Sequence, residues 1–147
     1  MCNSLFQVRA HKFTHVTAME SMFYRHNIID KIMVDISRVV QEDTKIFIVD
    51  FYRNAPWEVV NSGVNRHLKL GYPLITAEEM SMVVANSPLE EVACEDFTEN
   101  ILRPCDIFAE EALKRDPEQK HLTYPMMRDA FYDKTLKMVA FTLRLSK

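Results

Sequence analysis

KIFIVDFY, residues 45–52, is the most strand-like stretch of this sequence and decides its fold. Ile46 to Val49 form an almost continuous apolar run, which is typical of a central strand that is covered on both faces. Asp50 is the only acidic residue within the stretch. Asp43-Thr44 ends a helix before it and Asn54-Ala55-Pro56 begins another after it, so we expect the strand to lie between helices.

Two further stretches alternate between apolar and polar residues with the period of a strand. They cover residues 4–12 and 135–145, at the two ends of the chain. Together with residues 45–52 they predict a small sheet built from the start, the middle and the end of the sequence.

A long helix is predicted over residues 17–41. Thr17 and Glu20 have the spacing of a capping box, in which each side chain bonds the backbone N–H of the other. The apolar residues that follow recur in steps of three and four, as in a coiled-coil seam with one histidine in it. This pattern predicts a core helix that also offers an interaction surface, formed by Met19, Met22, His26, Ile29, Met33 and Ile36.

Capping boxes and prolines mark the other predicted helices. Thr76 and Glu79 predict a helix to about residue 86, and Ser87 and Glu90 predict another that Pro104 kinks or ends. Further helices are expected over residues 57–70, 105–115 and 124–133. The predicted fold class is α+β: a helix-dominated single domain with a small sheet of strands 4–12, 45–52 and 135–145 and a long helix at 17–41.

The composition of the chain argues against several classes of protein. The 147 residues fit one domain and include only two glycines, too few for the phosphate-binding loops of P-loop or dinucleotide-binding enzymes. No apolar run is long enough for a membrane span, and the first residues do not resemble a secretory signal. Three cysteines without a C-x-x-C pair indicate a reduced, cytoplasmic protein.

No cofactor and no metal are predicted. His11 and His15 have a spacing that suits two metal ligands on a helix. Strand geometry in this region would instead separate them by roughly 13 Å. Glu20, His26 or Asp30 would have to complete such a zinc site, and no spacing requires it.

Two His-x-Thr steps, His15-Val16-Thr17 and His121-Leu122-Thr123, stand out among the polar residues. A pair of such steps resembles the motifs of two-histidine phosphoesterases. The resemblance implies a catalytic set of His15, Thr17, His121 and Thr123, in which one histidine acts as general base and the other as general acid. Thr17 and Thr123 are equally explained as helix caps.

Nucleic-acid binding is an alternative that the charge distribution suggests. Residues 76–118 carry 12 acidic and 3 basic residues, whereas the rest of the chain is basic. Basic side chains can follow a phosphate backbone while aromatic rings stack on bases, which favours single-stranded RNA or DNA. The residues that would do so on the terminal strands are Arg9, Lys12, Lys137, Phe141 and Arg144.

The leading functional prediction is a non-enzymatic protein-interaction or regulatory module that acts through its helical surface. Its partners would be an unidentified protein or a second copy of the chain, with nucleic acid as the alternative and no membrane. Nine methionines support this reading, because methionine-rich surfaces adapt to different partners. A two-histidine phosphoesterase is the third hypothesis for the function.

Overall fold

The structure is a computed structural model that describes residues 13–56, 58, 72–115 and 123–146. The α+β fold class is confirmed, because this part of the chain forms four α-helices and a four-stranded mixed sheet. None of its helices is long and apolar enough to cross a membrane. The elements in chain order are β1 (Phe13–Met19), the 3-10 helix η2 (Met22–Ile28), α1 (Ile29–Ser37), β2 (Val40–Arg53), α4 (Ala77–Ala85), β3 (Leu89–Asp96), α5 (Thr98–Arg115), α6 (Thr123–Tyr132) and β4 (Leu136–Leu145).

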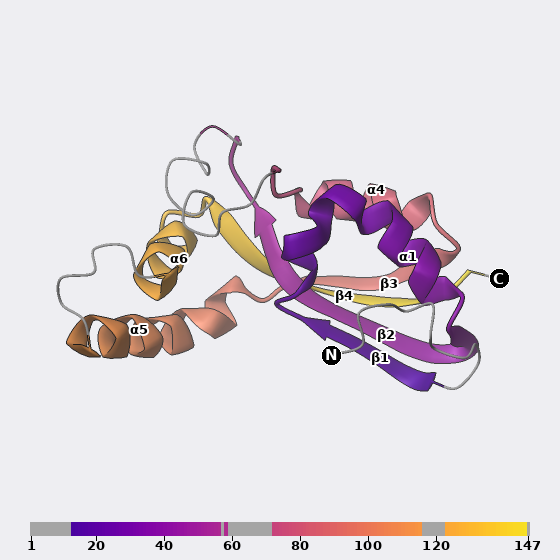
Figure 1. The fold of residues 1–147 in the computed structure, drawn as a ribbon, viewed down its shortest axis with the longest axis horizontal. Coiled ribbons are helices and arrows are strands. Elements are labelled where there is room, and N and C mark those ends of the chain that lie inside the picture. The colour runs from indigo at the N-terminus through magenta and orange to yellow at the C-terminus, as the bar shows by residue number, and fades with distance from the viewer. Residues whose placement is uncertain (1–12, 57, 59–71, 116–122, 147) are drawn as a thin grey trace.

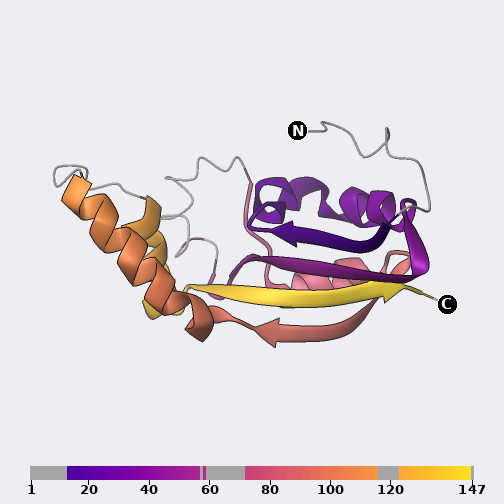
Figure 2. The same ribbon diagram turned by 90° about the horizontal axis from the view of Figure 1, so that it is seen from below.

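The sheet has the strand order β1-β2-β4-β3, which Figure 2 shows from β1 at one edge to β3 at the other. β1 runs parallel to β2, and β4 runs antiparallel to both of its neighbours. The predicted strand at 45–52 is therefore the core of β2, and the predicted strand at 135–145 is β4. Ile46 and Ile48 of β2 are fully buried, as expected for a central strand.

One face of the sheet is covered by η2, α1 and α4, which lie side by side in Figure 1. The main core cluster lies between these helices and the sheet. On the opposite face a second, smaller cluster packs α6 against the ends of β2 and β4. The α5–α6 pair is inserted between β3 and β4, and it projects from one end of the sheet (Figures 1 and 2).

The capping box at Thr76 is present with both of its hydrogen bonds. Glu79 N–H donates to the Thr76 hydroxyl at 3.0 Å, and Thr76 N–H donates to the Glu79 carboxylate at 2.7 Å. The predicted start of this helix, α4, is thereby confirmed. The box also aims Glu79 at Arg53 of β2, with which it forms an ion pair.

We expect Thr76→Ala to lower the free energy of unfolding by about 1 kcal/mol, because it removes the hydroxyl that caps α4. Urea denaturation followed by circular dichroism measures the change. Thr76→Ser keeps the hydroxyl and serves as the matched control. An equal loss in the two variants would contradict the capping role.

The prediction of one helix over residues 17–41 is wrong. Residues 13–19 form β1, and Thr17 lies within this strand rather than at a helix cap. The helical part begins at Met22 and is interrupted at Arg25, whose φ of −137° is not helical. Parallel pairing with β2 satisfies the backbone of residues 13–19, and this tertiary contact outweighs the local capping pattern.

The predicted interaction surface on this segment is mostly core. Met33 is 0% exposed, and Ile29 and Ile36 are buried beside it against the sheet. Met22 is half-buried, and Met19 lies on β1 rather than on a helix. The stripe of apolar residues therefore packs the helices onto the sheet, because a stripe this wide needs a globular core.

The helix predicted to begin at Ser87 is also wrong. Residues 89–96 form β3, which pairs antiparallel with β4. The Ser87 hydroxyl instead donates to the Val84 carbonyl and accepts from Leu89 N–H, so it ends α4. Acidic residues along β3 suit an edge strand, because charges there discourage further pairing.

The last helices follow the predictions more closely. α5 runs from Thr98 to Arg115 through Pro104, where a kink or an end was expected. The prediction of a helix over residues 124–133 is confirmed by α6. The strand predicted at 4–12 and the helix predicted at 57–70 lie outside the described residues, apart from position 58.

Candidate functional site

The carboxyl ends of the parallel strands β1 and β2 meet at the same end of the sheet. Met19, the last residue of β1, is paired with Val49 of β2. In open α/β sheets, ligands bind in the crevice outside the carboxyl ends of the parallel strands. β3 also ends here, and α5 begins beside it, so α5 lies at the same end of the sheet (Figure 1).

Glu20 stands at the carboxyl end of β1 in an uncommon backbone conformation. Its φ of 48° is in the left-handed region, which residues other than glycine seldom adopt. The side chain is exposed, and its backbone N–H donates to the Val49 carbonyl at 2.8 Å. Strained residues of this kind cluster at functional sites, so Glu20 is the first candidate residue.

Asp50 lies behind Glu20 on β2 and is 0% exposed. Its carboxylate accepts the backbone N–H of Met22 with one oxygen and that of Phe51 with the other, the latter at 2.8 Å. Hydrogen bonds from backbone N–H groups stabilise a buried carboxylate. Asp50 therefore ties the turn that follows β1 to the central strand.

Two further side chains with polar atoms, His26 and Tyr52, are buried in the core near Asp50. His26 Nδ1 accepts the backbone N–H of Ile75 at 3.2 Å, and its ring stacks on the Tyr52 ring with centroids 5.6 Å apart. Burial lowers the pKa of His26 to about 4, although the charge of Glu79 opposes this shift. Burial, reinforced by the charge of Asp50, raises the pKa of Tyr52. Both rings are therefore neutral near pH 7.

His26 Nε2 and the Tyr52 hydroxyl are buried, and neither has a hydrogen-bond partner among the residues that the structure describes. A buried polar atom without a partner destabilises a fold and is rare. The core beside the carboxyl end of β2 therefore contains two buried polar atoms without a hydrogen-bond partner among the described residues.

Cys105 of α5 lies near Glu20. Burial raises the pKa of the Cys105 thiol, and the negative charges of Glu20 and Asp106 raise it further. A thiol with a raised pKa stays protonated at neutral pH and is a poor nucleophile. Cys105 and the neighbouring Ile101 of α5 pack against the smaller core cluster, at the end of the sheet where Glu20 lies.

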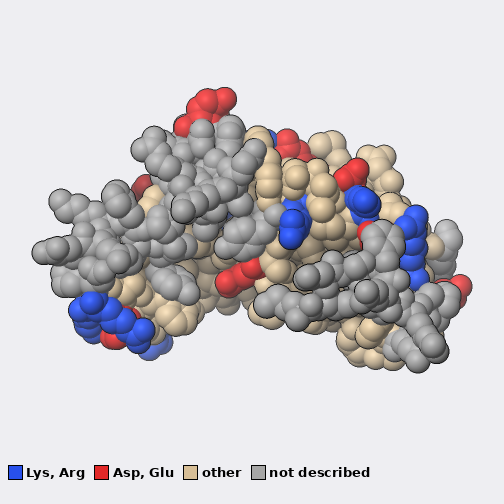
Figure 3. All heavy atoms as spheres, in the orientation of Figure 1, with Lys and Arg blue, Asp and Glu red and all other residues tan. Residues whose placement is uncertain are grey.

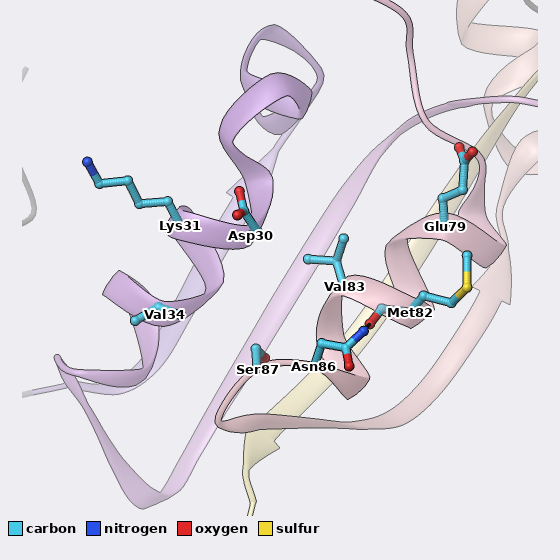
Figure 4. A pocket seen from close by; sticks show the side chains of 8 residues that line it. All are labelled: Asp30, Lys31, Val34, Glu79, Met82, Val83, Asn86 and Ser87. Carbon is cyan, nitrogen blue, oxygen red and sulfur yellow. Dashed lines mark hydrogen bonds between the residues drawn. The ribbon is translucent and has the colours of Figure 1, made fainter.

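Two of the pockets lined by described residues lie beside α4 and beside the α5–α6 pair. The first, of about 590 Å³, is a groove between α1 and α4, and Figure 4 shows Lys31 pointing away from it. Glu79 on its border is already paired with Arg53. The second, of about 550 Å³, lies between the α5–α6 pair and the adjoining ends of β3 and β4, and includes Asn54, Thr98 and Tyr132. Neither pocket is lined by Glu20 or by any residue of β1.

Of the predicted catalytic set, the structure describes His15 and Thr17 on β1 and the backbone of Thr123 on α6. His15 and Thr17 are exposed on β1, and His15 Nδ1 lies 3.1 Å from the neighbouring Thr14 hydroxyl. Thr123 is the first residue of α6, which packs against the carboxyl end of β2 and the start of β4 (Figure 1). His121 lies outside the described residues.

The predicted nucleic-acid residues do not form one exposed surface. Phe141 is 0% exposed, so its ring cannot stack on a base. Lys137 pairs with Glu78, and Arg144 pairs with Glu90. The basic side chains visible in Figure 3 lie in separate small groups. Arg9 and Lys12 lie outside the described residues.

Within the described ranges, no three His, Cys, Asp or Glu residues are arranged to hold a metal ion. His11, one half of the predicted histidine pair, lies outside these ranges. The two described cysteines, Cys94 and Cys105, are free thiols.

No protein-family model matches the chain, and no curated protein matches it. Solved structures do match its fold. The chain is similar to a protein from Galdieria sulphuraria assigned as a sarcosine dimethylglycine methyltransferase, with a TM-score of 0.79 and 10% identity over 97% of this chain and 57% of that one. It is also similar to geranyl diphosphate C-methyltransferase from Streptomyces coelicolor A3(2), with a TM-score of 0.74 and 13% identity over 97% of this chain and 52% of that one.

A third similar structure is a cyclopropane synthase from Mycobacterium tuberculosis, with a TM-score of 0.70 and 13% identity over 96% of this chain and 58% of that one. The chain thus spans between half and three-fifths of the length of these solved structures. The geranyl diphosphate enzyme is recorded with Mg²⁺, geranyl diphosphate and S-adenosylhomocysteine, and a related structure is recorded with S-adenosylmethionine (SAM).

These matches correct the functional prediction. A non-enzymatic interaction or regulatory module was expected, yet the solved structures that share this fold are enzymes. The alternative hypotheses for the function, single-stranded nucleic-acid binding and a two-histidine phosphoesterase, are wrong for the same reason. The low glycine content excluded phosphate-binding loops, and it said nothing about this other class of enzyme. The predicted partners, a second copy included, stay predictions.

The described residues do not by themselves form a site for SAM. β1 is the edge strand of the described sheet, so these residues supply only one side of a crevice there. Both glycines, Gly63 and Gly71, lie outside the described part, and neither described pocket reaches β1.

This site does not follow from the helix predicted over residues 17–41, which places Glu20 inside a helix. Glu20 was considered only as a capping residue and as a conditional metal ligand, and Asp50 was noted only as the acid in its strand. Had residues 13–19 been assigned as a strand parallel to 45–52, the two acids would have fallen at adjacent carboxyl ends. That arrangement is the signal for a ligand site in such a sheet.

Proposed function

We propose that this chain forms the acceptor side of a SAM-dependent methyltransferase and that Glu20 contacts the acceptor. The observation that carries this proposal is the exposed Glu20 carboxylate at the carboxyl end of β1, held in a left-handed conformation near α5. The similarity of the whole described fold to methyltransferases supports it.

An apolar acceptor suits the surroundings of Glu20 best. Met19 beside it is 70% exposed, and α5 presents Cys105 with apolar neighbours nearby. Two of the similar structures are named for a geranyl and a mycolic acid substrate. Apolar side chains around one carboxylate would bind a hydrocarbon chain and leave a single charged group to orient it.

Glu20 can act on the acceptor in two related ways. Its carboxylate can accept a proton that the acceptor loses, which is general-base catalysis. It can also stabilise positive charge that develops on the acceptor, because a carboxylate fixed by the backbone needs little reorganisation. Both roles depend on the charge of the side chain and on its position.

We expect Glu20→Gln to reduce methyl transfer by about 100-fold, since a positioned base contributes roughly this factor. The assay follows label from methyl-tritiated SAM into geranyl diphosphate, a phospholipid with an unsaturated acyl chain, and sarcosine. Asp43→Asn, a change at an exposed site in β2, is the control and should leave transfer unchanged.

Transfer to the geranyl or acyl acceptor that depends on Glu20 would support the proposal. Absence of transfer to all three acceptors would contradict the methyltransferase assignment. Transfer that Glu20→Gln leaves intact would contradict the role of Glu20 while keeping the activity.

We also keep the prediction of a reducing, cytoplasmic compartment as part of this proposal. The free thiols of Cys94 and Cys105 are compatible with it. Measuring the localisation of a tagged full-length protein tests it, and export from the cell would contradict it.

A further inference from the structure

The backbone on both sides of Glu20 is bound to two consecutive residues of β2. On one side, Glu20 N–H donates to the Val49 carbonyl at 2.8 Å. On the other, Met22 N–H donates to the carboxylate of Asp50. These two hydrogen bonds enclose the residue whose φ is 48°, so the central strand fixes the conformation of the turn.

The second of these bonds replaces a local helix cap. Ser21 stands at the cap position of η2, and serine is a preferred residue there, yet its side chain makes no capping hydrogen bond. The first N–H of η2 is satisfied instead by Asp50, which is 28 residues further along the chain. The direction in which the chain leaves β1 is therefore set by the sheet.

Asp50 is suited to fixing the Met22 backbone because its side chain is held in place in the core. Its carboxylate is buried, and its other oxygen accepts Phe51 N–H at 2.8 Å from the same strand. A second bond, from Ile75 N–H to His26 Nδ1, holds the far end of η2. The turn that carries Glu20 is thus anchored by side chains that solvent does not reach.

We propose that Asp50 is a positioning residue that holds the Glu20 carboxylate at the carboxyl end of β1. This inference rests on the proposed function for its catalytic consequence. Asp50 does not contact the acceptor. It acts by fixing the backbone of Met22 and, through it, the left-handed conformation of Glu20.

The test compares Asp50→Ala and Asp50→Asn with Asp30→Asn, a control at an exposed acid on α1. A backbone N–H that donates to a carboxylate has a downfield proton resonance, so the Met22 amide is a direct probe of the bond. We expect this resonance to move upfield in Asp50→Ala, to move less in Asp50→Asn, which keeps one acceptor oxygen, and to stay in place in the control. Asp50→Asn keeps the question open to measurement if Asp50→Ala does not fold.

Activity gives the second measurement. We expect Asp50→Ala to lower kcat for methyl transfer roughly tenfold or more with little change in KM for the acceptor, because misplacing a reacting group slows the chemical step. Asp50→Asn should recover most of this loss. In a Glu20→Gln background, Asp50→Ala should cause little further loss, since the two residues act as one unit.

The outcomes separate the two proposals. A Met22 amide that does not shift in either Asp50 variant overturns the positioning role, whatever the activity. Additive losses from the Glu20 and Asp50 variants overturn it as well, because they indicate a general structural effect. An amide that shifts as expected in a protein without methyl transfer supports the positioning of Glu20 and contradicts the proposed function alone.

Discussion

Phe141→Ala is expected to lower the free energy of unfolding by about 3–5 kcal/mol, the range found when a buried phenylalanine is truncated. Phe141 lies in the middle of β4 and is 0% exposed. Its ring meets the Tyr52 ring edge-on with centroids 5.5 Å apart, and it belongs to the main core cluster. Removing the ring opens a cavity that neighbouring strands and helices cannot readily fill.

Urea denaturation followed by circular dichroism measures this loss against a matched control. Phe13→Ala removes the same ring from a residue of β1 that is 39% exposed, so it should cost much less. Phe141→Leu keeps most of the volume and should cost less than Phe141→Ala. If Phe141→Ala and Phe13→Ala destabilise equally, the placement of Phe141 at the centre of the core is contradicted.

The second large effect is expected from pH at His26. The folded pKa of about 4 lies below the ordinary value of 6.5, because burial disfavours the charged ring. Between these values the unfolded chain binds a proton that the folded chain does not. Titration of His26 therefore does not affect the free energy of unfolding above about pH 6.5. As the pH drops towards 4, it lowers the free energy of unfolding by a total of about 3 kcal/mol.

His26→Gln should remove this component of the pH dependence. The amide oxygen of glutamine can accept Ile75 N–H in place of His26 Nδ1, and it does not titrate. The measurement is the free energy of unfolding in urea at several values between about pH 4 and 7. His15→Gln changes an exposed histidine of β1 and is the control.

We expect the stability of wild type and His15→Gln to fall more steeply with decreasing pH than that of His26→Gln. Equal slopes in wild type and His26→Gln would show that His26 does not titrate between these limits, contrary to its burial.

Helix starts that depend on neighbouring residues were predictable from the sequence. The capping box of Thr76 and Glu79 uses side chains and N–H groups three residues apart, and it forms as expected at α4. The pattern at Thr17 and Glu20 has the same spacing and forms no cap, because residues 13–19 pair with β2. The two boxes differ in their tertiary neighbours and not in their local chemistry.

The candidate site was less predictable than the fold class. Asp50 was visible as the acid within the central strand, whereas Glu20 was placed in a capping box at the start of a predicted helix. Their relation depends on the parallel register that places Met19 beside Val49, which no local pattern contains. Phe141 and Lys137 were read as an exposed binding surface because alternation alone does not show which face of a strand is covered.

Apolar periodicity and contacts within one helical turn were enough to predict the α+β class, the central strand at 45–52, the last strand and the start of α4. Residues 13–19 and 89–96 are strands because they pair with β2 and β4, and the same pairing brings Glu20 and Asp50 to one end of the sheet. The physical reason is distance along the chain: the bond from Met22 to Asp50 joins residues 28 positions apart, and strand pairing settles such contacts.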